Sequence, residues 1–249
     1  MEKMNYIQSF RRYENKYLLT QKQAEAFLQA VGEWILPDQY GEYTIRNLYL
    51  DTEDFYFIEH SLDKPVYKEK LRLRSYGAVD EQDRVFLEIK KKYRGIVYKR
   101  RIALPLKEAE GYICEGNRPQ NIEGEHPEQI LEEIDYLMKR YKPYPRIYLA
   151  YDRQAYRAKE YPQLRITFDR NIRSRWQDMT LQSDDRTQLL DTGTEQYRLM
   201  EIKSDGALPV EFAMVLSKLK IFPVSFSKYG NIYMNSIKGI EQKETEENE

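Results

Sequence analysis

The sequence predicts an α+β protein in which an antiparallel β-barrel surrounds a charged lumen and several α-helices flank the barrel. Three observations lead to this fold class. Many segments alternate polar and apolar residues with a period of two, as β-strands do. The polar sides of at least five of these segments are rich in Lys and Arg. A few other segments have the apolar spacing of amphipathic helices.

The composition favours one domain in which charge acts locally. The 249 residues are 41% hydrophobic and 33% charged, which is enough apolar material for one sizeable core. The formal net charge is -1, so no overall positive excess indicates nucleic acid or a membrane surface. A lone cysteine, Cys114, and two histidines, His60 and His126, argue against a Cys/His zinc site. With no apparent signal peptide and no apolar run of membrane-spanning length, we expect a soluble cytoplasmic protein.

The elements are predicted from periodicity, caps and turn residues. Thr20 is a candidate N-cap for the first helix, and Pro209 suits the first turn of a later one. The segment 105–127 is interpreted as a long loop with one short helix. We expect one domain over residues 1–240 and a disordered acidic tail over 241–249. Strands are predicted at 10–19, 43–51, 68–76, 84–92, 95–104, 146–157, 163–172 and 197–205, and helices at 20–34, 127–141, 207–221 and 225–237.

The charged side chains fall on one face of each predicted strand. The simplest interpretation is a sheet with one packed and one solvated face, as antiparallel sheets often have. A solvated face would usually mix neutral polar residues with both signs of charge, whereas here Lys and Arg dominate. The apolar faces can be covered by the helices, which leaves the charges inside a barrel. The residues on the charged faces are Arg12, Glu14, Lys16, Lys68, Lys70, Arg72, Arg74, Glu88, Lys90, Lys92, Lys99, Arg101, Arg165, Thr167, Asp169, Glu201 and Lys203.

Such a lumen predicts an anionic, phosphate-rich ligand. Cations that repel one another in an empty lumen gain charge-assisted hydrogen bonds when a polyphosphate enters. The few carboxylates suit Mg²⁺ or Mn²⁺, which take one or two carboxylates together with phosphate oxygens and water.

The ordered motifs resemble the VTC (vacuolar transporter chaperone) domain of the CYTH-like, triphosphate tunnel metalloenzyme superfamily. They are RRYENKYLL, NLYLDT, KLRLRSYG, VFLEIKKK, KRRI, YLAYDRQAY, LRITFDRNIR, LMEIKSDGALP and FSKYG, and they span roughly residues 8–237. The resemblance implies an eight-stranded antiparallel tunnel that binds triphosphate or polyphosphate and a divalent metal. It also implies a polyphosphate polymerase, which moves the terminal phosphate of ATP onto a polyphosphate chain.

The resemblance also implies roles for individual residues. Catalytic roles fall to Arg72 and Arg74 of R-x-R, Lys90 of E-x-K and Lys228 of S-K-[FY]. The alternative for the carboxylates is a simple ion pair on one strand face, Glu14 with Lys16 and Glu88 with Lys90. The substrate-binding set is Lys16, Lys70, Arg72, Arg74, Lys90, Lys99, Arg101, Arg153, Arg165, Lys203 and Lys228, and the expected ligands of Mn²⁺ or Mg²⁺ are Glu201, Glu14 and Glu88.

Two departures from the family pattern limit these expectations. Arg12 stands where many tunnel enzymes have the first glutamate of E-x-E-x-K, which weakens the case for a triphosphatase with two metal sites. The chain shows no inositol-phosphate sensor and no membrane segment, so coupling to transport would require a separate membrane-protein partner. An inorganic triphosphatase and a non-catalytic polyphosphate-binding module remain the alternatives, and nucleic acid is not expected as a partner.

Overall fold

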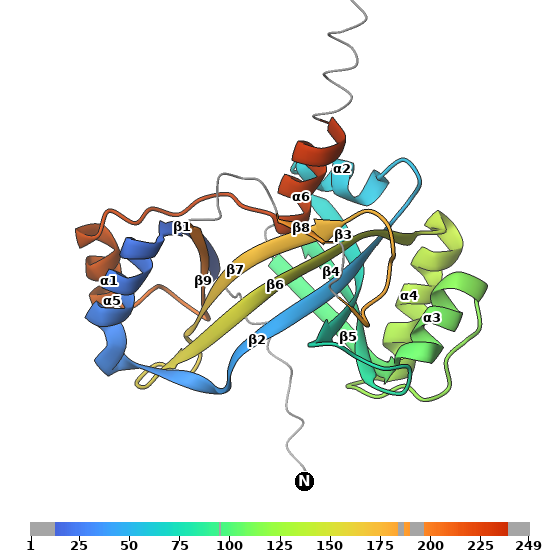
Figure 1. Cartoon of the computed structure of the whole chain (residues 1–249), viewed down its shortest axis with the longest axis horizontal. Helices are drawn as coiled ribbons and strands as arrows, with labels where there is room; N and C mark the ends of the chain where they lie inside the picture. The colour runs from blue at the N-terminus through green and yellow to red at the C-terminus, as the bar shows by residue number, and fades with distance from the viewer. Residues whose placement is uncertain (1–12, 95, 184–186, 190–196, 239–249) are drawn as a thin grey trace, which may run out of the picture.

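The computed structural model describes residues 13–94, 96–183, 187–189 and 197–238. Strands are the most common regular element, and helices are inserted between them (Figure 1). The elements are β1 (Tyr13–Thr20), α1 (Gln21–Val31), the 3₁₀ turn η1 (Gly32–Trp34), β2 (Ile35–Asp51), α2 (Tyr56–Leu62), β3 (Tyr67–Tyr76), β4 (Arg84–Tyr93), β5 (Ile96–Pro105), α3 (Leu106–Glu115), α4 (Pro127–Tyr141), β6 (Tyr144–Ala158), β7 (Arg165–Arg175), β8 (Gln188–Leu189), β9 (Tyr197–Ser204), α5 (Val210–Lys218), α6 (Lys228–Tyr233) and the π-helical turn η2 (Met234–Lys238).

The strands form one antiparallel sheet in the order β1-β9-β7-β6-β2-β3-β4-β5, and the short β8 pairs with β7. The eight antiparallel strands are therefore confirmed. The expected closed barrel is not: within the described residues the edge strands β1 and β5 do not pair. The sheet is nevertheless strongly curled, since Glu14 on β1 lies 3.9 Å from Lys90 on β4, measured from Oε2 to Nζ.

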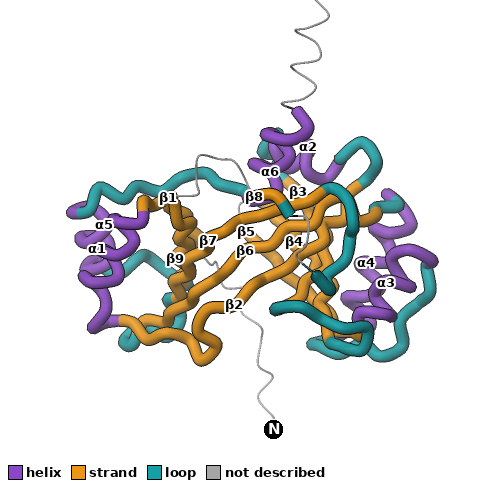
Figure 2. Tube along the Cα trace, viewed as in Figure 1, coloured by secondary structure: helices purple, strands orange, loops and turns teal. Residues whose placement is uncertain are grey.

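Helices cover the convex, apolar face of this sheet in two groups (Figure 2). α3 and α4 pack over β2–β5 around a core that includes Leu71, Leu87 and Ile134. α1 and α5 pack at the other end over a core that includes Phe27 and Phe212. The prediction that apolar strand faces lie outside under amphipathic helices is confirmed, and it leaves the charged faces on the concave side.

A third apolar cluster, which the period-two pattern did not indicate, lies on the concave side under α2 and α6. The rings of Tyr49 on β2 and Tyr229 on α6 stack 4.7 Å apart between centroids. α2 was not predicted, and its N-cap Phe55 offers no side-chain hydrogen bond. Asp51 instead accepts the backbone N–H groups of Phe57 and Ile58. The concave face is thus packed at one end rather than charged along its whole length.

Several local expectations hold closely. α4 occupies 127–141 as predicted, and Thr20 caps α1 in a reciprocal capping box with Gln23.

Other elements differ from the predicted bounds. α5 covers only Val210–Lys218 of the predicted 207–221 and begins after Pro209. The predicted loop 105–127 contains the ten-residue α3, while β2 begins at Ile35 rather than at residue 43. The tail 241–249 and Arg12 lie outside the described residues, among which no helix is long and apolar enough to cross a membrane.

Candidate functional site

The concave face gathers charged side chains from seven strands and from the start of α6. Each strand contributes because its alternate side chains point to this face. Cations clearly outnumber carboxylates, so the face has a net positive charge. The cations are Lys16, Lys70, Arg72, Arg74, Lys90, Lys99, Arg101, Arg153, Lys203 and Lys228, and the carboxylates are Glu14, Glu88, Asp169 and Glu201.

Glu88 is the centre of one half of this face. Its carboxylate lies 2.7 Å from Nη2 of Arg72, 2.6 Å from Nζ of Lys99 and 3.7 Å from Nε of Arg74. Arg101 is more distant, at 4.0 Å, and its guanidinium sits half-exposed at the rim. Burial alone would raise the pKa of Glu88, but Arg72, Arg74 and Lys99 outweigh burial and lower it to about 2. Glu88 is therefore ionised and holds these cations in a fixed arrangement.

Asp169 and Glu201 are the centre of the other half. Asp169 accepts two hydrogen bonds from Arg153, at 2.6 and 2.8 Å, and pairs with Lys228 at 2.5 Å. Lys228 also reaches Glu201 at 3.3 Å, and Lys203 lies 3.2 Å from the same carboxylate. Burial opposes ionisation of Glu201, yet Lys228 and Lys203 hold its pKa well below the usual range. The result is a buried network in which every carboxylate has at least two cationic partners.

Glu14 links the two halves. Its carboxylate lies 3.6 Å from Lys16, 3.8 Å from Lys203 and 3.9 Å from Lys90. Lys16 also lies 3.7 Å from Glu201, so the two glutamates share both Lys16 and Lys203. The alternative of a Glu14–Lys16 ion pair is present in this geometry, as one part of a larger network.

Two groups beside Arg72 have shifted pKa values. Burial lowers the pKa of Lys70 to about 8, and its ammonium group lies 3.4 Å from the Ser227 hydroxyl. The phenol of Tyr49 also faces the cations. Burial would raise the pKa of this phenol, but Arg72 and Lys70 outweigh burial and lower it to about 8, and Arg72 donates to it at 3.1 Å.

Arg165 pairs with a carboxylate outside the two networks. It lies 3.6 Å from Asp38, and its side chain is 45% exposed. In the sheet it stands directly opposite Lys203. Arg165 therefore marks one end of the cationic face.

Asp169 is absent from the predicted metal and substrate sets, although it is fully buried at the centre of the site. A signal for it exists in the sequence, because the spacing in RITFD puts Arg165, Thr167 and Asp169 on one face of a strand. The periodicity predicts which face of the strand Asp169 lies on, but it does not predict which residue Asp169 pairs with. Only the pairing of β6 with β7, which sets Arg153 opposite Asp169, explains the role of the carboxylate.

The predicted metal ligands separate into two groups. Glu14 and Glu201 share lysines and are close together, whereas Glu88 belongs to the other half of the face. Among the described residues no group of three His, Cys, Asp or Glu side chains could hold an ion by itself. A pair of carboxylates completed by phosphate oxygens and water is the usual arrangement for Mg²⁺ at phosphate sites. The donor set therefore fits a divalent ion that binds together with a phosphate ligand.

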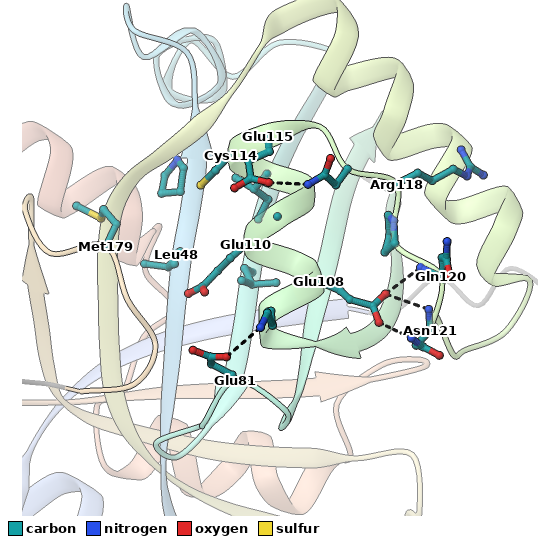
Figure 3. Close-up of a pocket in the computed structure, with 17 residues that line it drawn as sticks. Leu48, Glu81, Glu108, Glu110, Cys114, Glu115, Arg118, Gln120, Asn121 and Met179 are labelled. Atoms are coloured by element: carbon teal, nitrogen blue, oxygen red, sulfur yellow. Dashed lines mark hydrogen bonds and ion pairs between the residues drawn. The ribbon is translucent and has the colours of Figure 1, made fainter.

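A sizeable cavity lies elsewhere, on the convex side beside α3 (Figure 3). It measures about 770 Å³, and Leu48, Glu110 and Cys114 are among its lining residues. Another lining residue, Glu108, holds the neighbouring loop through the backbone N–H groups of Gln120 and Asn121. None of the predicted site residues lines this cavity, so the charged concave face is the better candidate site.

Comparisons with known proteins agree with this geometry. The sequence profile of the VTC domain matches residues 11–236. A proposed adenylate cyclase from Bacillus halodurans has the same fold, with a TM-score of 0.52, 15% identity and coverage of 87% of this chain and 95% of that one. A proposed adenylyl cyclase from Hippeastrum, described as having a dominant triphosphatase activity, has a TM-score of 0.50, 13% identity and coverage of 89% and 94%. No curated protein sequence matches significantly. The chain therefore belongs to the VTC domain family and has the fold of the CYTH-like triphosphate tunnel proteins.

Proposed function

We propose that this protein is a metal-dependent phosphotransferase of the polyphosphate polymerase type. The observation that carries the proposal is the imbalance of charge on the concave face, where cations outnumber carboxylates on a surface built from seven strands. A linear chain of phosphates supplies the missing anions, and every phosphate can accept hydrogen bonds from two sides of the curled sheet. Membership of the VTC domain family supports the same substrate class.

In this proposal Arg72, Arg74, Lys90 and Lys228 contact the γ-phosphate of ATP. The remaining cations, Lys16, Lys70, Lys99, Arg101, Arg153, Arg165 and Lys203, hold the other phosphates. A terminal oxygen of the growing chain forms the new P–O bond while the bond to the β,γ-bridging oxygen breaks, so ADP leaves and the chain gains one phosphate. Phosphoryl transfer of this kind depends mainly on in-line positioning and on neutralisation of charge.

Glu201 and Glu14 are the proposed ligands of Mn²⁺ or Mg²⁺, and Glu88 is assigned to fixing Arg72 and Lys99. When bound, the ion would neutralise charge on the transferring phosphate. A phosphate acceptor is already anionic and needs no side chain to remove a proton. Each of the four carboxylates on this face is engaged by cations, which supports phosphate rather than water as acceptor. We assign the reaction to the cytoplasm, and export of the chain would need a separate membrane partner.

The test is an incubation of the purified protein with ATP and Mn²⁺ in which chain length, ADP and free phosphate are all measured. Chains that lengthen in step with ADP release support the polymerase. Free phosphate without chains, particularly from tripolyphosphate, would indicate the triphosphatase instead. Tight polyphosphate binding without turnover would leave a binding module.

The variant Glu201→Gln separates an enzyme from a binder. It should abolish metal-dependent turnover while polyphosphate binding in EDTA persists. Glu133→Gln is the matched control, since Glu133 pairs with Lys91 and Arg100 on the convex face. Turnover that survives Glu201→Gln would overturn the metal assignment.

A further inference from the structure

Thr167 carries a buried hydroxyl with no explained partner at the centre of the site. The residue is 1% exposed and is the third residue of β7, between Arg165 and Asp169 on the concave face. Its Oγ1 atom is fully buried and has no hydrogen-bond partner among the described residues. A buried hydroxyl that has given up its hydrogen bonds to water is destabilising.

Fold stability alone does not account for threonine at this position. Valine has nearly the same shape, favours strands equally well and has no hydroxyl to satisfy. The neighbour of Thr167 on β6 is Ala155, which offers no side-chain partner for the hydroxyl. A polar atom retained under these conditions indicates a partner that is present in another state of the site.

The neighbour on the other side is Glu201, directly opposite Thr167 in the register between β7 and β9. Directly opposed residues have Cβ atoms about 4.5–5.5 Å apart, within reach of a hydroxyl-to-carboxylate hydrogen bond. In the structure both Glu201 oxygens face cations: Oε1 lies near Lys16 and Lys228, and Oε2 near Lys203 and Arg153. These are the same cations that the proposed function assigns to phosphate.

We propose that Thr167 is a positioning residue for Glu201, donating its hydroxyl hydrogen to that carboxylate once a phosphate chain has drawn the lysines away. The inference rests on the proposed function, because it needs phosphate to compete for the lysines. One Glu201 oxygen would then be held by Thr167 while the carboxylate serves as a metal ligand. Carboxylates that bind metals are themselves usually hydrogen-bonded, and loss of such a partner typically lowers metal affinity by about 10- to 100-fold.

The test measures Mn²⁺ binding in the presence of tripolyphosphate, by electron paramagnetic resonance of the free ion, for the wild type, Thr167→Val and Thr167→Ser. Thr167→Val should bind Mn²⁺ about 10- to 100-fold more weakly, and Thr167→Ser, which keeps the hydroxyl, should recover most of the affinity. Tripolyphosphate binding in EDTA and the melting temperature should not fall in Thr167→Val. A purely structural hydroxyl would not give this combination.

Thr44→Val is the matched control. The Thr44 hydroxyl donates to Asp152 at 2.8 Å, away from the concave cations, so its loss should lower the melting temperature and leave Mn²⁺ affinity unchanged. Wild-type Mn²⁺ affinity in Thr167→Val, or a parallel loss of stability and of phosphate binding in EDTA, would overturn the inference. A wild-type protein that binds no Mn²⁺ with tripolyphosphate would instead contradict the metal assignment of the proposed function, so the two failures are distinguishable.

Discussion

Asp169 Oδ2 lies 2.5 Å from the ammonium group of Lys228, and this contact joins strand β7 to the first residue of α6. Asp169 is fully buried and also accepts two hydrogen bonds from Arg153. Burial opposes the charge of Lys228, but Asp169 and Glu201 outweigh it and raise the pKa of the lysine. Asp169 therefore keeps the side chains of Arg153 and Lys228 in place.

The variant Asp169→Asn should lower the free energy of unfolding by on the order of 3 kcal/mol, because it leaves Arg153 and Lys228 without their shared anion in a buried site. Urea unfolding at pH 7 checks this value. Glu133→Gln weakens two ion pairs, with Lys91 and Arg100, that are partly exposed on the convex face. It should lower the free energy of unfolding by no more than about 1 kcal/mol. Equal costs for the two variants would contradict the importance assigned to burial.

A second prediction concerns acid stability and Glu88. The pKa of this carboxyl is lowered from 4.5 to about 2 in the folded protein, so its ionised form stabilises the fold above pH 4.5. That stabilisation is lost as the pH falls through the range from about 4.5 to 2, and the shift corresponds to roughly 3 kcal/mol. Wild type and Glu88→Gln should therefore differ most near neutral pH and converge below about pH 4.5. Urea titrations at a series of pH values measure the difference in stability between the two proteins. A difference that does not depend on pH would contradict the lowered pKa of Glu88.

Competition between lysines and metal gives a third prediction. Glu14 and Glu201 are both engaged by Lys16 and Lys203, so Mn²⁺ alone must displace these ammonium groups before it can bind. The free protein should bind Mn²⁺ weakly, and tripolyphosphate should strengthen binding by drawing the lysines away.

Lys203→Met and Lys16→Met should each raise Mn²⁺ affinity in the absence of phosphate, roughly several-fold, since one competing cation is gone. Lys99→Met is the control, because Lys99 pairs with Glu88 in the other half of the face. Calorimetric titration with Mn²⁺ provides the measurement. If both lysine variants match the wild type, the two glutamates do not form the metal site.

Part of this architecture could be predicted from local sequence. A period of two assigns Arg72, Arg74 and Lys90 to one face whatever the rest of the chain does, because side chains alternate along a strand. The capping box at Thr20 and the apolar spacing of 127–141 are equally local, and both helices form where predicted.

The remaining features depend on residues that are far apart in the chain. The N-terminus of α2 is held by the side chains of Asp51 and Thr52 a few residues earlier, and Asp51 in turn accepts a hydrogen bond from Tyr229 of α6, far along the chain. The partners of Asp169 come from β6 and α6, and no local pattern identifies them. Whether the sheet closes is likewise decided by its two edge strands, so periodicity predicts a charged face but not a closed barrel.

The last prediction links ligand binding to protons. Burial lowers the pKa of Lys70 to about 8, and it lowers that of Lys99 to about 8 against the attraction of Glu88. Near pH 8 each lysine is therefore about half protonated. A bound phosphate favours the charged ammonium form, and it also favours the protonated form of Tyr49, whose pKa is about 8. All three groups change in the same direction, so polyphosphate binding at pH 8 should take up roughly one proton or more, and affinity should fall as the pH rises above 8.

Calorimetry in buffers with different ionisation enthalpies measures the proton uptake, and Lys99→Arg should reduce it by about half a proton because arginine stays charged. Proton release, or uptake that Lys99→Arg does not change, would show that these side chains do not contact the bound phosphates.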